Sequence, residues 1–209
     1  MKEDAQLRER VLSHAGKRFF EEGFSRITTD ELSRELGISK KTLYREFRSK
    51  KEILGAVVRR KLEEVERELA EVCDDEGRGF LERLRAQLHV ATRIGHTLSK
   101  PFISDLARFA PELWEEISRF RQERVFSRME RLLRAGQEEG LLRREVEPKL
   151  LVTIVVTIAE NLLVPGRLTE LDFVPRDVIR HVELMIAHGV LSEAGEARLV
   201  ELEGGREPK

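Results

Sequence analysis

The chain has 209 residues and a mass of 24.2 kDa; 40% of its residues are hydrophobic and 37% are charged. This balance excludes a disordered chain, because enough apolar side chains are present to bury a core. The longest apolar run, residues 150–159, is shorter than the roughly 20 residues that span a membrane, and the first residues show no secretory signal. With Cys73 as its single cysteine the chain can form no internal disulfide, so we expect a cytoplasmic protein.

The net charge of −1 conceals an uneven distribution along the chain. Residues 1–60 carry a net charge of +5, whereas residues 61–209 carry −6. A basic N-terminal segment on an acidic body is typical of a module that binds a polyanion and is joined to a domain with another role. Charge alone does not distinguish such a module from a solvated, lysine-rich helix face.

Helical periodicity begins near the N-terminus. Apolar residues recur at every fourth position over residues 4–22, which predicts a first helix. Thr28 and Glu31 match the capping box that opens a short second helix, and Gly37 ends it. Ser39 is then placed to cap a third helix. Two short helices joined by a glycine-containing turn form the helix-turn-helix layout.

The rest of the chain also has the pattern of helices, with prolines and glycines at the ends of segments. The expected helices cover residues 49–73, 80–98, 101–111, 112–139, 148–165 and 175–189, which gives about nine in all. Residues 150–159 are rich in β-branched side chains, which favour a strand, but no other segment could pair with them and Pro148 fits the first turn of a helix. The expected fold class is therefore all-α, with a polar tail over residues 193–209.

The third helix carries the side chains that indicate a function. With Leu43 and Phe47 facing the core, its outer side presents ammonium, guanidinium, hydroxyl and phenol groups. These groups suit the major groove of DNA, which admits one α-helix and displays acceptors for Lys and Arg. A short basic helix does not by itself require DNA binding, but Tyr44, the only tyrosine, lies on this outer side, where no core role is expected. Exposed backbone N–H groups where helices begin, near Thr28 and Lys50, would bind phosphate.

Residues 7–54 resemble the N-terminal domain of the tetracycline-repressor (TetR) family of bacterial regulators. The matching segments are FFEEGF at 19–24, the Thr28 cap, LGISKKTLYREF at 36–47 and SKKEIL at 49–54. Two positions depart from the family pattern: Ser33 stands where alanine is typical, and Lys41 where glycine is frequent. The first change should be harmless, and the second adds a cation toward DNA.

The resemblance implies a set of DNA contacts and a domain organisation. The implied contacts are Thr28, Lys40, Lys41, Thr42, Tyr44, Arg45 and Lys50. Base reading would fall mainly to Lys41, Thr42 and Arg45, and phosphate positioning to Thr28, Tyr44 and Lys50. The expected domains are a helix-turn-helix DNA-binding domain over residues 1–52, a helical regulatory and dimerisation domain over 53–192, and the polar tail.

Beyond residue 60 the resemblance concerns architecture only, and it implies that the last two long helices form the four-helix bundle of a dimer. The helices at 148–164 and 175–189 carry more apolar residues than one buried face needs, which favours a second partner surface and a homodimer. Two-fold symmetry would place two recognition helices about one DNA turn apart, roughly 34–36 Å, or a multiple of it.

An aromatic-rich segment and several polar side chains suggest a site for a hydrophobic or amphipathic small molecule. The candidate residues are His89, Arg93, Phe102, Leu106, Phe109, Trp114, Phe120, Arg124 and Asn161. Taken singly, each aromatic is more often part of a core, and each arginine is more often an ion-pair partner at the surface. Taken together, they fit the mostly apolar pocket with a few polar anchors that helical bundles form.

These patterns favour a regulator over an enzyme. The five histidines have no nearby Cys or Asp at metal-binding spacing, and no phosphate loop, nucleophile elbow or triad is present, so we expect no metal and no cofactor. The expected function is a transcriptional repressor that leaves its double-stranded operator when an effector favours another spacing of the DNA-binding domains. One alternative is an activator or partner-controlled regulator without a small-molecule effector; another is a helical scaffold.

Overall fold

The computed structural model describes residues 2–73, 75, 77–162 and 165–204. The helices are α1 (Lys2–Glu22), α2 (Thr29–Leu36), α3 (Lys40–Glu46), α4 (Lys50–Cys73), α5 (Phe80–Thr97), α6 (Lys100–Phe109), α7 (Pro111–Phe120), α8 (Ser127–Glu138), α9 (Pro148–Leu162), α10 (Pro165–Glu170), α11 (Pro175–Gly189) and α12 (Glu193–Gly204), with a π-helix, η1 (Arg121–Phe126), between α7 and α8. Within the described part of the chain, the sole β feature is an antiparallel bridge between Leu142 and Leu191. The expected all-α fold class is confirmed.

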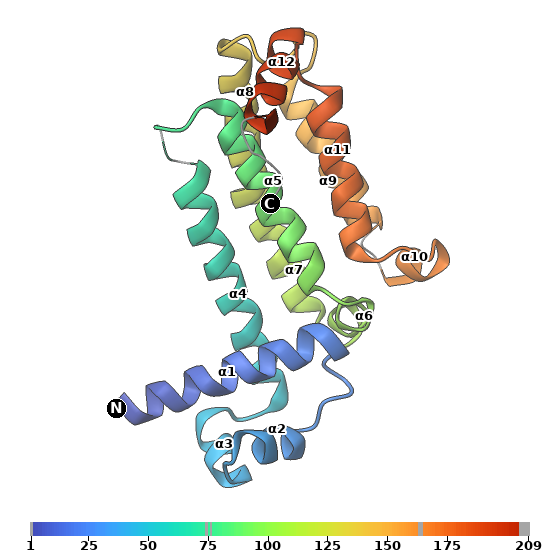
Figure 1. The fold of residues 1–209 in the computed structure, drawn as a ribbon. Helices are drawn as coiled ribbons and strands as arrows, with labels where there is room; N and C mark the ends of the chain where they lie inside the picture. The colour runs from blue at the N-terminus through green and yellow to red at the C-terminus, as the bar shows by residue number, and fades with distance from the viewer. Residues whose placement is uncertain (1, 74, 76, 163–164, 205–209) are drawn as a thin grey trace.

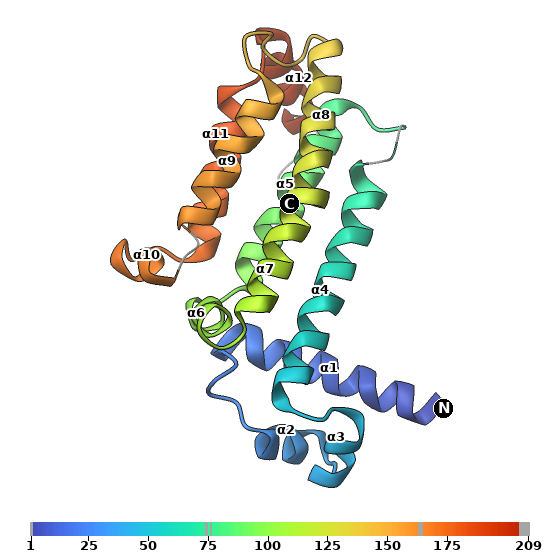
Figure 2. The same cartoon turned by 180° about the vertical axis from the view of Figure 1, so that it is seen from behind.

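The molecule has a small helical end and a longer helical body (Figure 1). Helix α1 crosses the lower end of α4, and α2 and α3 lie beneath it. The body rises along α4, with α5, α7 and α8 beside it, α9 and α11 on one flank, and α12 at the end far from α3, as both views show (Figures 1 and 2). Helix α6 lies between the small end and the body, because it packs against α1, α7 and α10.

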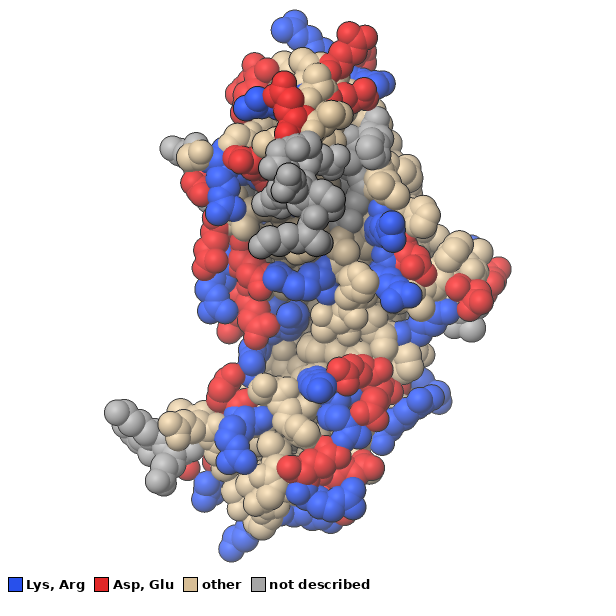
Figure 3. Space-filling view, in the orientation of Figure 1, with Lys and Arg blue, Asp and Glu red and all other residues tan. Residues whose placement is uncertain are grey.

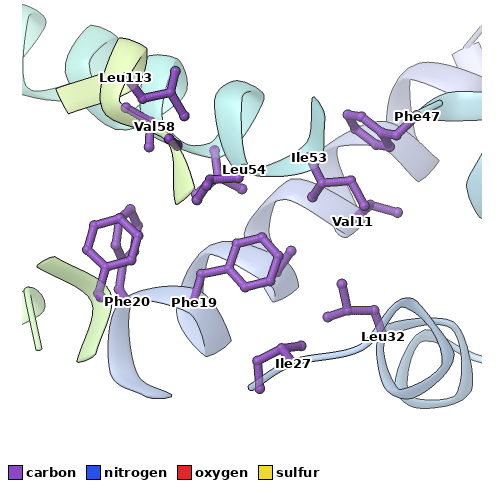
Figure 4. Packing of buried hydrophobic residues seen from close by; sticks show 14 of the residues in the cluster. Val11, Phe19, Phe20, Ile27, Leu32, Phe47, Ile53, Leu54, Val58 and Leu113 are labelled. Carbon is purple, nitrogen blue, oxygen red and sulfur yellow. The ribbon is translucent and has the colours of Figure 1, made fainter. Parts of the chain in front are cut away.

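One hydrophobic core joins the small end to the body (Figure 4). Its centre is made of fully buried side chains from the first four helices, among them Phe19, Leu32 and Leu43. Phe102 of α6 and Leu113 of α7 belong to the same cluster. The rings of Phe102 and Phe20 pack edge-to-face, with their centroids 4.8 Å apart. The small end is therefore packed onto the body by aromatic and aliphatic contacts.

The predicted helix boundaries in the small end agree with the caps that the structure contains. Thr28 Oγ1 accepts a hydrogen bond from Glu31 N at 3.2 Å, and Glu31 Oε2 accepts one from Thr28 N at 2.7 Å, which completes the capping box. Gly37 ends α2 with a left-handed φ of 66°, and Ser39 Oγ accepts from Thr42 N at 3.0 Å to begin α3.

The expected helix over residues 112–139 is not uniformly α-helical, because η1 interrupts it. A π-helical segment contains one more residue than an α-helical one over the same turn, and so it changes which side chains point inward after it. Before η1, Leu113 is buried; after it, Leu132 and Leu133 are buried. Arg124, one of the residues predicted to bind a small molecule, lies within η1 and is exposed.

Residues 150–159 lie in α9 and are helical, as Pro148 at its start predicted, despite their β-branched composition. Val152 and Val156 face the core of the body. Positions 163 and 164, the end of the predicted helix at 148–164, lie outside the described residues. Among the helices that the structure describes, none is both long enough and apolar enough to cross a bilayer.

The C-terminal region differs from the expected polar tail. Residues 193–204 form α12, in which Leu199 and Leu202 pack on the core of the body. The backbone at Gly195 lies so close to Leu141 that an added Cβ would sit 2.1 Å from its carbonyl oxygen. Sequence pattern misses this helix because its large apolar residues, Leu199, Val200 and Leu202, lie only in its second half, and a short helix owes most of its stability to tertiary packing.

Candidate nucleic-acid interface

Helix α3 separates its apolar and polar side chains as the sequence predicted. Leu43 and Phe47 are at most 1% exposed, whereas Tyr44 is 46% exposed. Lys41 and Arg45 are also exposed on the outer side of the same short helix. The condition on which a DNA-binding role depends, that this cationic side faces solvent, is therefore met.

Two of the α3 cations form ion pairs at the surface. Lys40 Nζ lies 2.6 Å from Asp30 Oδ1, and both side chains are more than half exposed. Arg45 lies 3.3 Å from a carboxylate oxygen of Asp4 and 3.4 Å from one of Glu46. Exposed pairs of this kind contribute at most about 1 kcal/mol, so a phosphate could replace these carboxylates as partner.

Hydroxyl groups join the start of α2 to α3. The Tyr44 hydroxyl and Thr29 Oγ1 are 3.1 Å apart and share a hydrogen bond. Thr42 Oγ1 and Ser39 Oγ are 2.8 Å apart at the start of α3. The first turn of α2, next to the Thr28 cap, thus lies beside Tyr44 on one surface. Thr29 is a member of this surface that the sequence reasoning missed, although the paired threonines at 28 and 29 were a visible signal.

Lys50 is placed differently from the other predicted contacts. Its Nζ donates to the carbonyl of Ile27 at 2.6 Å and to that of Ser25 at 3.5 Å, and it lies 4.3 Å from the centre of the Phe24 ring. Burial lowers the pKa of this ammonium, against the opposing charges of Asp105 and Glu31. Its neighbour Lys51 is exposed and pairs with Glu112 at 2.7 Å.

Figure 3 shows Lys and Arg side chains gathered at the lower end of the molecule, over α2 and α3, with acidic side chains among them. On the face that this view shows, the surface is therefore mixed in charge and has no continuous basic field. Sequence-specific contacts by a few residues fit this pattern better than charge-driven, non-specific binding.

The residues predicted to bind a small molecule are not gathered at one place. Phe102 and Leu106 lie in the core shared with the small end, and Trp114 packs against the same core, whereas Phe120 packs in another cluster. The remaining members of the set, His89, Arg93, Phe109, Arg124 and Asn161, are exposed. Two of them have local partners: Arg93 pairs with Glu68, and Asn161 Nδ2 donates to the Thr157 carbonyl at 2.7 Å.

A partly buried polar cluster that the sequence reasoning missed lies in the body at the start of η1. Arg121 Nη2 is 3.7 Å from Glu160 Oε1 and donates to Ser118 Oγ at 2.9 Å, while the guanidinium lies 5.6 Å from the Trp114 ring. Arg121 Nε and Glu160 Oε1 are buried without a hydrogen-bond partner. Burial lowers the pKa of Arg121, and the charge of Glu160 opposes this shift. The sequence analysis expected one continuous α-helix over residues 112–139, and this expectation did not predict the site.

The body also exposes large apolar side chains on α9 and α11. Leu150 and Ile154 of α9 are 58% and 47% exposed, and Leu184 and Met185 of α11 are 46% and 60% exposed. Both helices bury another face against the body, so these residues form a second apolar surface. In the described part of the chain, no three His, Cys, Asp or Glu side chains are grouped as a metal site would require.

Comparisons with known proteins agree with this arrangement. Residues 11–57 match the sequence model of the bacterial regulatory proteins of the tetR family. The chain is 21% identical over 184 residues to the helix-turn-helix-type transcriptional regulator YvaF of Bacillus subtilis, covering 88% of this chain and 95% of that one. It is 29% identical over 157 residues to the nucleoid occlusion factor SlmA of Vibrio campbellii, covering 73% and 78%.

The fold is also found among solved structures. It matches, with a TM-score of 0.70 and 18% identity, a protein from Saccharomonospora viridis described as a transcriptional regulator and crystallised in complex with choline; the match covers 90% of this chain and 100% of that one. A helix-turn-helix with an exposed polar second helix, carried on an all-helical body, defines a DNA-binding transcriptional regulator and not an enzyme. The N-terminal domain of the chain is thus similar to that of the TetR-family regulators, which bind DNA and act as dimers.

Proposed function

We propose that the protein is a dimeric repressor that binds its operator through α3 and the start of α2 and is released by a hydrophobic or amphipathic small molecule. The observation that carries the DNA-binding half of this proposal is the division of α3 between buried Leu43 and Phe47 and exposed Lys41, Tyr44 and Arg45. A helix anchored on one side and cationic on the other can enter the major groove without moving its core residues.

The proposed contacts are assigned by the positions of the side chains. Lys41, Thr42 and Arg45 read base edges, because Lys and Arg can donate to guanine acceptors and a threonine hydroxyl to either kind of base edge. A second group, Thr28, Lys40 and Tyr44, positions the phosphate backbone. Lys50 is left out of the second group, since its ammonium is bound to backbone carbonyls.

A double variant tests this assignment. Lys41→Ala with Tyr44→Ala should abolish binding to a duplex that the wild-type protein selects from a random-sequence library, as measured by a gel-shift titration across salt. The dimer and the helical content should stay intact, because both side chains are exposed. The matched control is Arg85→Ala with His89→Ala, which removes a cation and an aromatic from exposed positions of α5. Undiminished binding by the α3 double variant would contradict the contacts.

The proposed dimer forms through α9 and α11, whose outward apolar side chains would otherwise stay in water. Light scattering should give twice the monomer mass of 24.2 kDa. Ile154→Glu with Met185→Glu should give the monomer, since a buried, unpaired carboxylate opposes association. Val200→Glu, at a 66% exposed position of α12, is the matched control and should remain dimeric. A wild-type monomer at micromolar concentration would exclude this interface.

The proposed effector binds near Arg121, Glu160 and Trp114. This cluster offers one donor and one acceptor without a hydrogen-bond partner beside an aromatic ring, which are the polar anchors expected of a mostly apolar site. The match from Saccharomonospora viridis was crystallised with choline, and an indole ring with a carboxylate is chemistry that binds a quaternary ammonium. An amphipathic effector with a polar head at this cluster is therefore the preferred class.

Titrations of Trp114 fluorescence separate the possible head groups. Choline and dodecyltrimethylammonium test a cationic head, and dodecanoate tests an anionic one. Binding of a cationic probe should be lost in Glu160→Gln, and binding of dodecanoate in Arg121→Gln. Whichever probe binds should also weaken binding to the selected duplex. If all three probes leave both the fluorescence and the duplex affinity unchanged, control by an effector of this class is contradicted.

A second candidate function is DNA binding without a small-molecule effector. SlmA, one of the relatives, is described as a nucleoid occlusion factor, which is not the description of a ligand-released repressor. Specific duplex binding that no small molecule alters would favour this candidate, whereas no duplex binding at all would leave only a helical scaffold.

A further inference from the structure

The loop between α1 and α2, residues 23–27, lies directly against α6. Ser25 N donates to Asp105 Oδ2 at 2.6 Å, and Asp105 is only 8% exposed. Gly23 has a left-handed φ of 92°, and a Cβ there would lie 2.9 Å from both Asp105 Oδ2 and Pro101 Cβ. The loop thus needs a residue without a side chain at position 23 in order to reach the buried carboxylate.

Lys50, at the start of α4, binds the same loop through its carbonyl groups. Its ammonium has three donors, and the carbonyls of Ile27 and Ser25 lie 2.6 and 3.5 Å away. The Phe24 ring lies 4.3 Å from the ammonium, within the range of a cation–π contact. Ser25 is therefore held twice, by its N–H from α6 and by its carbonyl from α4.

The 23–27 loop leads directly into the proposed DNA surface. Ile27 precedes the Thr28 cap of α2, and Thr29 shares a hydrogen bond with Tyr44 of α3. A shift of the loop would move the first turn of α2 and, through Thr29, the Tyr44 hydroxyl. The end of α1, which precedes the loop, is also bound to the body, because Ser99 N at the start of α6 donates a hydrogen bond to the Phe20 carbonyl at 3.1 Å.

We propose that Lys50 and Asp105 are positioning residues for DNA binding: together they hold the 23–27 loop and so place the start of α2 and Tyr44 for the duplex. This inference rests on the DNA-binding function proposed above, and it replaces the phosphate contact that sequence resemblance implied for Lys50. Neither side chain needs to touch DNA, and each acts through the backbone of the loop.

The salt dependence of binding distinguishes a positioning lysine from a phosphate contact. Each cation that neutralises a phosphate adds about one to the magnitude of the salt slope. Lys50→Met keeps most of the length of the side chain and removes the charge. It should weaken binding to the selected duplex about tenfold, the loss expected for one hydrogen bond to a charged group, and leave the slope unchanged. Lys40→Met, which removes a proposed phosphate contact, is the matched variant, and its slope should fall by about one.

Asp105→Ala gives a test in which the two explanations predict opposite signs. Removing a carboxylate near the DNA-binding end would tighten binding if only long-range charge mattered. If Asp105 positions the loop, the same change weakens binding about tenfold, because Ser25 N loses its charged acceptor. Ser104→Ala, at an exposed position of α6, is the control and should bind as the wild type does.

Hydrogen exchange measured without DNA reports the loop itself. Peptides covering residues 23–31 should exchange faster in Lys50→Met and Asp105→Ala, while peptides from α5 are unchanged. Asp105→Asn keeps an acceptor oxygen and should restore part of both the protection of the loop from exchange and the affinity for the duplex. This variant replaces Asp105→Ala in the test if the alanine variant does not fold.

Two results would overturn the proposal. The first is a Lys50→Met slope that falls by about one, with unchanged exchange in the loop, as a phosphate contact predicts. The second is an Asp105→Ala variant that binds the duplex as tightly as the wild type or more tightly. If the wild type selects no duplex at all, the proposed function fails, whereas the exchange data still decide whether the two side chains hold the loop.

Discussion

The small DNA-binding end and the body are both helical, but different kinds of interaction determine their details. In the small end, helix boundaries are set by side chains a few residues away, such as the Thr28–Glu31 capping box and the left-handed Gly37. In the body, the π-helix η1 and the packing of α12 depend on distant parts of the chain. Local signals can be read from a sequence alone, whereas tertiary ones cannot.

The two regions carry natural reporters, since the only tyrosine, Tyr44, lies in the small end and the only tryptophan, Trp114, lies in the body. Trp114 packs against the shared core. Urea unfolding followed by both fluorophores therefore measures whether the two regions unfold together. The shared core predicts coincident transitions in the wild type.

The largest effect is expected at the centre of the shared core. Phe19 is fully buried and meets Phe24 edge-on at 5.5 Å, so Phe19→Ala should lower the free energy of unfolding by about 4 kcal/mol. Both fluorophores should report the loss at the same urea concentration. Phe109→Ala, at a 41% exposed position, should change stability by less than about 0.5 kcal/mol. Separate Tyr44 and Trp114 transitions would show that the core does not couple the regions.

A smaller effect is expected from overpacking the body. A Cβ at Gly136 would lie 2.5 Å from the fully buried Phe80 ring, so Gly136→Ala should destabilise by about 2 kcal/mol. Gly55→Ala is the matched control in α4, because the nearest atom to its Cβ would be the end of Arg59 at 3.5 Å. This control should be neutral or slightly stabilising, since alanine favours a helix over glycine. A stable Gly136→Ala variant would mean that Phe80 can move.

The cap of the recognition helix should have an effect of intermediate size. Ser39→Ala removes the acceptor of Thr42 N and should cost about 1 kcal/mol in the urea experiment. Ser39→Asp retains an oxygen at the same place and should keep most of the stability. Equal stability of the alanine and wild-type proteins would show that this cap is not needed once the core has formed.

The smallest effect is a pH dependence in the body. Arg128 donates to both carboxylate oxygens of Glu66, at 2.7 and 2.9 Å, and these hydrogen bonds hold the pKa of Glu66 below its ordinary value of 4.5. Because the pKa is lower in the folded than in the unfolded protein, the ionised carboxylate stabilises the fold at pH values above 4.5. This stabilisation is lost as the pH falls through the folded-state pKa. The contribution should be about 1 kcal/mol or less, because Glu66 is partly exposed.

Glu66→Gln should remove this part of the pH dependence, as measured by urea unfolding between neutral pH and the acid limb. The exposed Glu63 on the same helix provides the matched Glu63→Gln control, which should keep the wild-type profile. An unchanged profile in Glu66→Gln would indicate that other carboxylates dominate the acid response.

These comparisons also explain which parts of the site were predictable. The burial of Leu43 and the exposure of Tyr44 were predicted by helical periodicity, because four-residue spacing fixes a common face. The position of Lys50 was not, since the carbonyls that bind it belong to the loop before α2. Arg121 and Glu160 come from segments far apart in the sequence, so no local pattern could pair them.

The π-helix η1 affects how this chain should be aligned with its relatives. One residue of an α-helix advances the chain by only 1.5 Å but rotates it by about 100°. A relative with an uninterrupted α-helix in this segment should therefore lack one residue there, and the correct alignment carries a single gap between α7 and α8. An ungapped alignment would compare Leu133 with the outward position that Arg134 occupies here, and every inference about the interior drawn from α8 would be displaced by one.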